Sequence, residues 1–140
     1  MPDLLIATDS SRVYQDVRAA VEEPGMTFRW ARSGQAVVPA LQDKGADLVV
    51  ADLQIGSMGG YAIAMDILLE AGAGRLGPTP VLLLLDRRAD VFLAKRTAVA
   101  GWLLKPLSPL RTQEAVGALL AGGTYCDTTY VPVPADVLTM

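Results

Sequence analysis

The sequence predicts one α/β domain with a doubly wound parallel sheet, and three observations lead to this fold class. Five short apolar runs are spaced along the chain, and each has the length of a strand. A stretch of helical length, with polar positions, follows each run. Several runs are apolar on both faces, which is typical of parallel strands that helices cover on both sides. The predicted strands are residues 4–7, 27–31, 48–51, 80–85 and 102–104.

The stretches between these runs carry start and stop signals for helices. Ser10 or Ser11 can cap the first helix, Pro24 and the glycine after it end that helix, and Ser108 can cap the last one. Pro39 lies inside the second predicted helix and weakens the prediction there. The predicted helices are residues 11–21, 34–44, 61–70, 90–98 and 109–120.

Five such strand–helix units suit the strand order 2-1-3-4-5 of flavodoxin-like domains. We expect this domain to span residues 1–121. Residues 122–140 begin with two glycines and contain further prolines, so they are predicted to form an extended C-terminal tail. Apolar residues such as Tyr125 and Tyr130 would allow this tail to pack back onto the domain.

Composition limits the function classes that need to be considered. The chain has 140 residues, a net charge of −3 and a pI of about 4.8, so we expect no binding to nucleic acid or to an anionic membrane. No apolar run approaches the roughly 20 residues of a membrane span, and no secretion signal is expected at the N-terminus. Cys126 is the single cysteine, which fits a reducing cytoplasm best.

The chain contains no histidine. Catalytic triads, cysteine–histidine dyads and histidine zinc sites are therefore excluded. A metal site in this chain would have to use oxygen ligands, which favours magnesium or calcium.

Charged residues follow the predicted strands where the ligand site of such a sheet lies. Asp9, Asp52 and Lys105 each follow a different strand, and Asp86 follows the fourth. The carboxyl ends of parallel strands meet at one edge, so these groups should converge there. Taken singly, each has a simpler explanation as a helix cap, a turn former or a solvated strand end. Their conjunction favours a shared pocket for a hard cation and a phosphoryl group.

Two segments carry a family resemblance. Residues 52–60 resemble the loop Asp-x-x-x-Pro-x-Met-x-Gly, with Met58 and Gly60 matching and Gly56 in place of the proline. Residues 101–106 match the pattern glycine–aromatic–x–x–Lys–Pro. Over most of its length the chain is thus similar to the receiver domains of two-component response regulators. The resemblance also implies a cis peptide bond before the proline of the second segment.

The resemblance implies a role for each residue at the predicted pocket. Asp52 would accept a phosphoryl group from a sensor histidine kinase or a phosphotransfer protein, and Lys105 would contact that group. Asp9, Asp52 and the backbone carbonyl of Gln54 would bind magnesium. Trp102 occupies the position of the aromatic switch residue, although a core aromatic on a short strand is the simpler interpretation. Such a domain is not expected to be an enzyme.

Two departures from the family pattern affect this site. Thr8 replaces the first of two adjacent acids, so the pocket formed by Asp9, Asp52 and Lys105 has a formal charge of −1 instead of −2. Cation affinity at oxygen sites follows ligand charge, which predicts weaker magnesium binding. Leu85 stands where the family has threonine or serine, and it cannot donate the hydrogen bond of roughly 1.5–3 kcal/mol that a hydroxyl gives a charged group.

The second departure bears on the switch more than on the chemistry. Leu85 is larger than serine or threonine and would hold Trp102 in one rotamer. Asp86, one residue further, could pair with Lys105 or repel the phosphoryl group. Phosphorylation of Asp52 is therefore expected, whereas its coupling to the output surface is weakened.

Three hypotheses follow from these residues. The first is a stand-alone receiver that acts by binding an output protein through the face of residues 90–98, 102–104 and 109–120, with a homodimer also possible. The second is a pseudo-receiver whose binding does not depend on phosphorylation. The third is a small-molecule-binding or enzymatic flavodoxin-like domain, which lacks the glycine-rich phosphate loop after the first strand.

Overall fold

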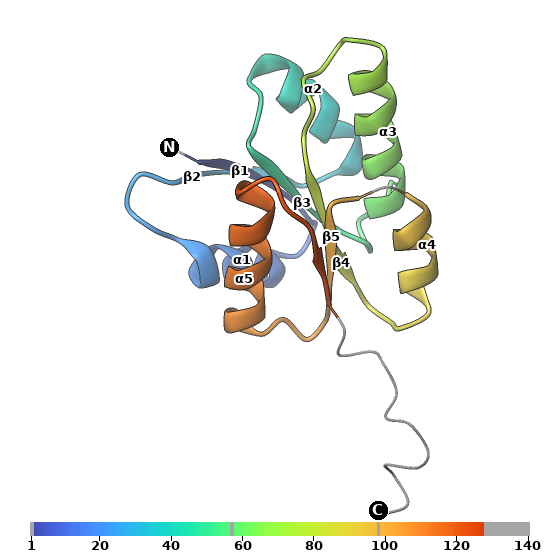
Figure 1. The fold of residues 1–140 in the computed structure, drawn as a ribbon. Coiled ribbons are helices and arrows are strands. Elements are labelled where there is room, and N and C mark those ends of the chain that lie inside the picture. Colours follow the sequence, from blue (N-terminus) through green and yellow to red (C-terminus); the bar gives the residue numbers. More distant parts are fainter. Residues whose placement is uncertain (1, 57, 98, 128–140) are drawn as a thin grey trace, which may run out of the picture.

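A computed structural model describes residues 2–56, 58–97 and 99–127 of the chain. Its centre is a parallel sheet with the strand order β2-β1-β3-β4-β5-β6 (Figure 1). The strands are β1 (Asp3–Ala7), β2 (Thr27–Ala31), β3 (Leu48–Asp52), β4 (Val81–Leu85), β5 (Gly101–Leu104) and β6 (Tyr125–Cys126). The helices are α1 (Ser11–Val21), η1 (Gly34–Ala36), α2 (Val37–Asp43), α3 (Gly60–Gly72), α4 (Asp90–Arg96) and α5 (Pro109–Leu120).

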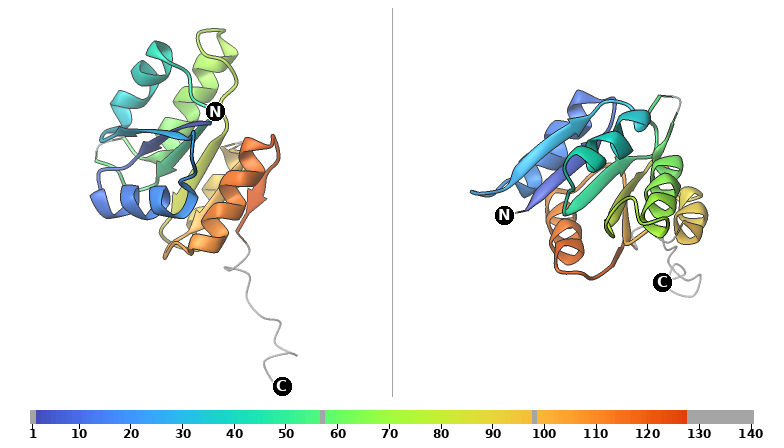
Figure 2. Two further views of the ribbon diagram at one scale, coloured as in Figure 1. Left: turned by 90° about the vertical axis from the view of Figure 1, so that its left-hand side faces the viewer. Right: turned by 90° about the horizontal axis from the view of Figure 1, so that it is seen from above.

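The sheet separates two apolar cores, as the doubly wound fold requires (Figure 2). Helices α2, α3 and α4 cover one face, and α1 and α5 cover the other. Alternate residues of each strand serve the two cores, so Leu83 and Leu85 of β4 face α3 and α4, whereas Leu82 and Leu84 face α1 and α5. The predicted α/β fold class and the order of the first five strands are confirmed.

The local signals in the sequence explain most helix boundaries. The Ser10 side chain caps α1 by accepting from the amide of Val13 at 3.2 Å. Pro39 is the third residue of α2, where a missing amide hydrogen removes no intrahelical bond, and a short 3₁₀ turn precedes it. Helix α4 ends at Arg96, so the predicted end at residue 98 is too late.

The sheet has a sixth strand that the prediction of five strands missed. Residues 125–126 pair in parallel with β5, so the first residues of the predicted tail belong to the sheet. This pairing is so close that a Cβ atom on Gly101 would lie 2.6 Å from the Tyr125 carbonyl oxygen. The side chain of Asp127, 1% exposed, then accepts from the amide of Leu104 at 2.9 Å. Residues 128–140 lie outside the described part of the chain.

Within the described ranges, none of the helices has the length and apolar character needed to cross a membrane.

Candidate functional site

The carboxyl ends of the central strands bring together the charged residues that the sequence placed there. Lys105, which follows β5, donates from Nζ to Oδ1 of Asp52 at 2.7 Å and to Oδ1 of Asp86 at 3.1 Å. Its backbone amide also donates to the Leu85 carbonyl at 2.9 Å, which fixes the residue beside β4. The peptide bond between Lys105 and Pro106 is cis, as the resemblance implies.

Asp52 is a buried carboxylate with an almost complete set of donors. Asp52 is only 2% exposed to solvent. Besides the Lys105 ammonium, Oδ1 accepts from the amide of Gln54 at 3.2 Å, and Oδ2 accepts from the Thr8 hydroxyl at 2.8 Å. A buried charge requires such pairing. Because a carboxylate offers about four lone-pair positions, one position on Oδ2 remains after these three bonds.

Thr8 replaces an acid with a neutral hydrogen-bond donor. It is fully buried, and while its hydroxyl donates to Asp52 it also accepts from the amide of Ser10 at 3.1 Å. The Thr8 carbonyl accepts from Nε1 of Trp30 at 2.8 Å. The side chain is therefore held in place from both sides, and it stabilises the Asp52 charge that a second acid would oppose.

The electrostatics of Lys105 favour its charged form. Burial lowers the pKa of the ammonium group, but its hydrogen bonds to Asp52 and Asp86 outweigh burial, so the pKa is raised above its ordinary value. The ammonium is thus a fixed positive charge between two carboxylates at neutral pH.

The loop after β4 positions Asp86. The buried carboxylate of Asp90 accepts from the amides of Asp86 at 3.2 Å and Arg87 at 2.9 Å. Oδ2 of Asp86 is buried and makes no hydrogen bond to a described residue. Of the two roles left open for Asp86, the structure shows pairing with Lys105. Sequence reasoning missed Asp90; the available signal was an acid in the first turn of a predicted helix, where the helix dipole favours negative charge.

Asp9 is placed differently from Asp52. It is exposed, and its Oδ2 accepts from the amide of Gly56 at 3.1 Å. The described residues contain no group of three or more metal-binding side chains. The magnesium ligands proposed from the sequence include only two such side chains, those of Asp9 and Asp52, together with the Gln54 carbonyl. Its oxygen chemistry fits magnesium, because Oδ1 of Asp9 has no described partner and Oδ2 of Asp52 keeps one lone pair.

The two predicted switch residues lie in the core between the sheet and α4. Leu85 is 0% exposed and Trp102 is 6% exposed, and both pack in one cluster with Val91. The Trp102 ring is thus turned inward, and its Nε1 is buried without a partner among the described residues. The arrangement agrees with the simpler interpretation of Trp102 as a core aromatic.

Comparison with known proteins gives the family. The sequence model of one protein family, the response regulator receiver domain, matches residues 4–117. A search of curated proteins gives no significant match.

Solved structures give the same fold. A LuxR-family two-component response regulator from Aurantimonas sp. is 20% identical, with a TM-score of 0.81 over 100% of this chain and 99% of the other. The signal receiver domain of a signal transduction histidine kinase from Syntrophus aciditrophicus is 27% identical, with a TM-score of 0.75 over 87% and 92%. The isolated receiver domain of RcsB from Salmonella enterica, with the phosphomimetic BeF3−, is 18% identical, with a TM-score of 0.73 over 93% and 95%.

Receiver domains in general interact with histidine kinases or phosphotransfer proteins and with output partners, and their phosphorylation typically depends on magnesium. The chain therefore belongs to the response regulator receiver domains, the family of two-component phosphorelay signalling.

Proposed function

We propose that this chain accepts a phosphoryl group on Asp52 and acts by binding another protein. The observation that carries the proposal is the ion pair between the buried Asp52 carboxylate and Lys105 at the carboxyl ends of β3 and β5. A nucleophile and a fixed positive charge lie side by side at the edge where such sheets bind ligands.

The residues account for an in-line transfer without a proton acceptor. The Asp52 carboxylate is paired with the Lys105 ammonium, and one of its oxygens can attack the phosphorus of a phosphohistidine directly. A phosphorus–oxygen bond forms, the phosphorus–nitrogen bond breaks, and the leaving imidazole keeps the electron pair. Lys105 then neutralises the transferred oxygens, while Asp86 holds the ammonium in place.

Magnesium, when bound, would supply further positive charge to the phosphoryl oxygens. Asp9, Asp52 and the Gln54 carbonyl would hold it. Thr8 contributes no charge to this set, so we infer a lower magnesium affinity than a site with a second acid would have.

A phosphorylation-independent binding module is the second candidate. It is supported by Thr8, whose hydroxyl bonds to Asp52, and by Leu85, which is fully buried beside Trp102. In that case Asp52 and Lys105 would serve as a structural ion pair, and partner binding would not respond to a phosphodonor.

The test combines intact mass with fluorescence. The protein is incubated with magnesium and acetyl phosphate, and Asp52→Asn is treated in parallel. We expect the mass of one phosphoryl group on the parent chain alone. A folded protein without the adduct would rule out phosphorylation of Asp52.

Fluorescence then separates the two candidates. Trp30 also emits, and it stacks on Tyr14 at 4.4 Å, so a Trp30→Phe background isolates Trp102. An adduct that changes Trp102 emission supports the receiver, whereas an adduct with unchanged emission supports chemistry uncoupled from the switch.

We also infer the cellular setting. A sensor histidine kinase or a phosphotransfer protein would supply the phosphoryl group, and the chain itself would have no enzymatic output. The single free cysteine, Cys126, is exposed and suits the cytoplasm.

A further inference from the structure

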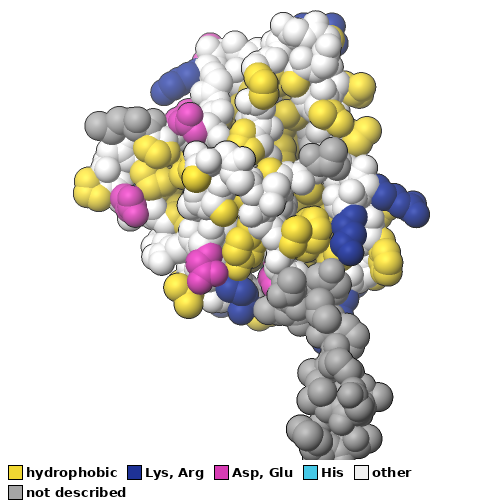
Figure 3. All heavy atoms as spheres, in the orientation of Figure 1, with side chains coloured by type: hydrophobic (Ala, Val, Ile, Leu, Met, Phe, Trp, Pro, Cys, Tyr) yellow, Lys and Arg dark blue, Asp and Glu magenta, His cyan; other side chains and the backbone are white. Residues whose placement is uncertain are grey.

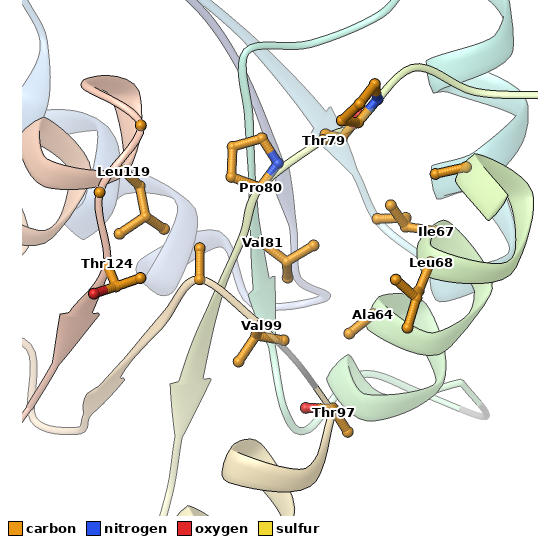
Figure 4. A pocket seen from close by; sticks show the side chains of 15 residues that line it. Ala64, Ile67, Leu68, Thr79, Pro80, Val81, Thr97, Val99, Leu119 and Thr124 are labelled. Atoms are coloured by element: carbon orange, nitrogen blue, oxygen red, sulfur yellow. The ribbon is translucent and has the colours of Figure 1, made fainter.

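A cavity of about 540 Å³ lies at the end of the sheet opposite Asp52 (Figure 4). Ala64, Ile67 and Leu68 of α3 form one wall. Val81 at the start of β4 and Val99 before β5 line the centre, and the far side extends to Leu119 and Thr124. None of its lining residues is charged. Its size and apolar lining suit several apolar side chains.

The short α4 leaves this cavity open. The helix has seven residues and ends at Arg96, and Thr97 lies at the cavity edge. Figure 4 shows α4 stopping below the cavity while α3 continues along it. Within the described residues, α4 therefore contributes no side chain to the cavity lining, and α3 alone covers the start of β4 on this face.

The outer faces of α3 and α4 are also apolar. Of the six large hydrophobic side chains exposed among the described residues, five lie on α3 and α4. Phe92 is 72% exposed and Leu69 is 64% exposed, and the other three are Met65, Leu68 and Leu93. Figure 3 shows hydrophobic side chains gathered with Lys and Arg side chains on this side of the molecule. Exposed apolar patches of this kind mark interaction sites.

The exposed charge on α4 is positive, although the chain as a whole carries −3 and α3 carries the acids Asp66 and Glu70. The side chains of Arg88, Lys95 and Arg96 are exposed and make no hydrogen bond or ion pair with any described residue. By contrast, six arginines form ion pairs with carboxylates: Arg12, Arg18, Arg29, Arg75, Arg87 and Arg111. Asp90, the acid of α4, is buried and already paired with Arg87. Two of these cations, Lys95 and Arg96, lie next to Thr97 at the cavity edge and are thus available to an outside acid.

The neighbouring surface is less open to a partner. The output face expected from the sequence includes the outer edge of β5, but β6 pairs along that edge and Asp127 takes the Leu104 amide. A partner that binds α4 therefore finds its free apolar area on the α3 side.

We propose that the outer faces of α3 and α4, with the cavity beside them, form a docking site for an acidic segment of a partner protein. Apolar side chains of that segment enter the cavity, and its carboxylates pair with Lys95 and Arg96 at the nearby end of α4. The inference rests on the partner binding proposed above, and it does not depend on transfer of a phosphoryl group to Asp52.

Selection of random displayed peptides on the full chain tests the proposal. The enriched peptides are synthesised and titrated against the parent chain and four folded variants. Leu68→Glu alters the cavity wall, and its matched control is Leu110→Glu, which changes an exposed leucine on α5. Arg96→Glu reverses a cation at the site, and Lys44→Glu reverses an exposed lysine after α2 that does not line the cavity.

We expect enriched peptides that combine acidic and apolar residues. Leu68→Glu and Arg96→Glu should each weaken their binding by about tenfold or more, while the two controls change it less than about twofold. No enrichment, no acidic bias, or equal losses in the controls would overturn the docking site.

The phosphoryl adduct is measured on the same variants. Leu68→Glu should acquire it like the parent chain, because the cavity lies at the other end of the sheet. Peptide binding without an adduct in any variant would overturn phosphorylation alone, and an adduct without peptide binding would overturn the docking site alone.

Discussion

The two ends of the sheet differ in how far the protein satisfies its own charges. At the carboxyl end, Asp52 and Lys105 are largely buried and bonded to each other and to neighbouring groups. At the amino end, an apolar cavity is open and the nearby Lys95 and Arg96 have no described partner. The first arrangement suits chemistry that needs fixed positions, and the second suits recognition of another molecule.

The largest expected effect comes from breaking the charge pairing at the carboxyl end. Lys105→Met leaves Asp52 and Asp86 without their shared cation. Because Lys105 is partly exposed, we expect a loss of about 2 kcal/mol in the free energy of unfolding, between the values for buried and exposed pairs. Urea denaturation measures it, with Lys95→Met as the control from the amino end. Equal losses in the two variants would remove the contrast between the ends.

The next effect concerns Asp127, which directly follows β6 at the edge of β5. Asp127→Ala leaves the buried Leu104 amide without its acceptor. We expect a loss of about 1.5 kcal/mol in the free energy of unfolding, as for one buried donor left unsatisfied. Cys126→Ala, a change at an exposed residue of the same strand, should cost less than about 0.5 kcal/mol. Similar values for both would show that Asp127 does not anchor the strand.

A third change makes the carboxyl end more acidic. Thr8→Asp adds a carboxylate beside Asp52, and we expect magnesium affinity to rise by about tenfold. Without magnesium the variant should unfold at a lower urea concentration, since two adjacent buried carboxylates repel. Calorimetric titration and urea denaturation, with Thr8→Asn as the uncharged control, measure both. An unchanged affinity would argue against Asp52 as a magnesium ligand.

The smallest effect is a pH dependence. The pKa of Lys105 is raised in the folded state. Its contribution to stability is therefore complete at a pH below the pKa of a lysine in the unfolded chain, about 10.4. That contribution is lost as the pH rises through the folded-state pKa. Tyr61, whose pKa is raised to about 12 in the folded state, also lowers the stability once the pH exceeds about 10. This loss is the same in the parent chain and in Lys105→Met. The stability difference between the parent chain and Lys105→Met should therefore narrow in strong alkali, as urea denaturation at several pH values would show.

The carboxyl end could be predicted from the sequence because each of its residues follows a strand with a clear apolar pattern. Asp52 and Lys105 needed only the parallel order of the sheet to meet. Asp86 also lies at this end, but whether it pairs with Lys105 depends on the loop after β4. The Asp90 carboxylate fixes that loop, and no strand pattern predicts this contact.

The amino end could not be predicted in the same way. Its cavity exists because α4 stops at Arg96, and a difference of two residues in a helix end is below what sequence signals resolve. Strand β6 has two residues, too few for an alternating pattern, and its pairing depends on close approach to Gly101. Asp127 gave no signal because its role depends on that long-range pairing.

The short sixth strand has a consequence for solubility. An uncovered β5 would present free amide and carbonyl groups to any other extended chain, which is how sheets associate edge to edge. Here the two residues of β6 cover that edge. The carboxylate of Asp127 then accepts a hydrogen bond from the Leu104 amide, so the strand pairing ends at a charged side chain. A variant that loses Asp127 should therefore aggregate more readily on concentration, even where most of its fold is retained.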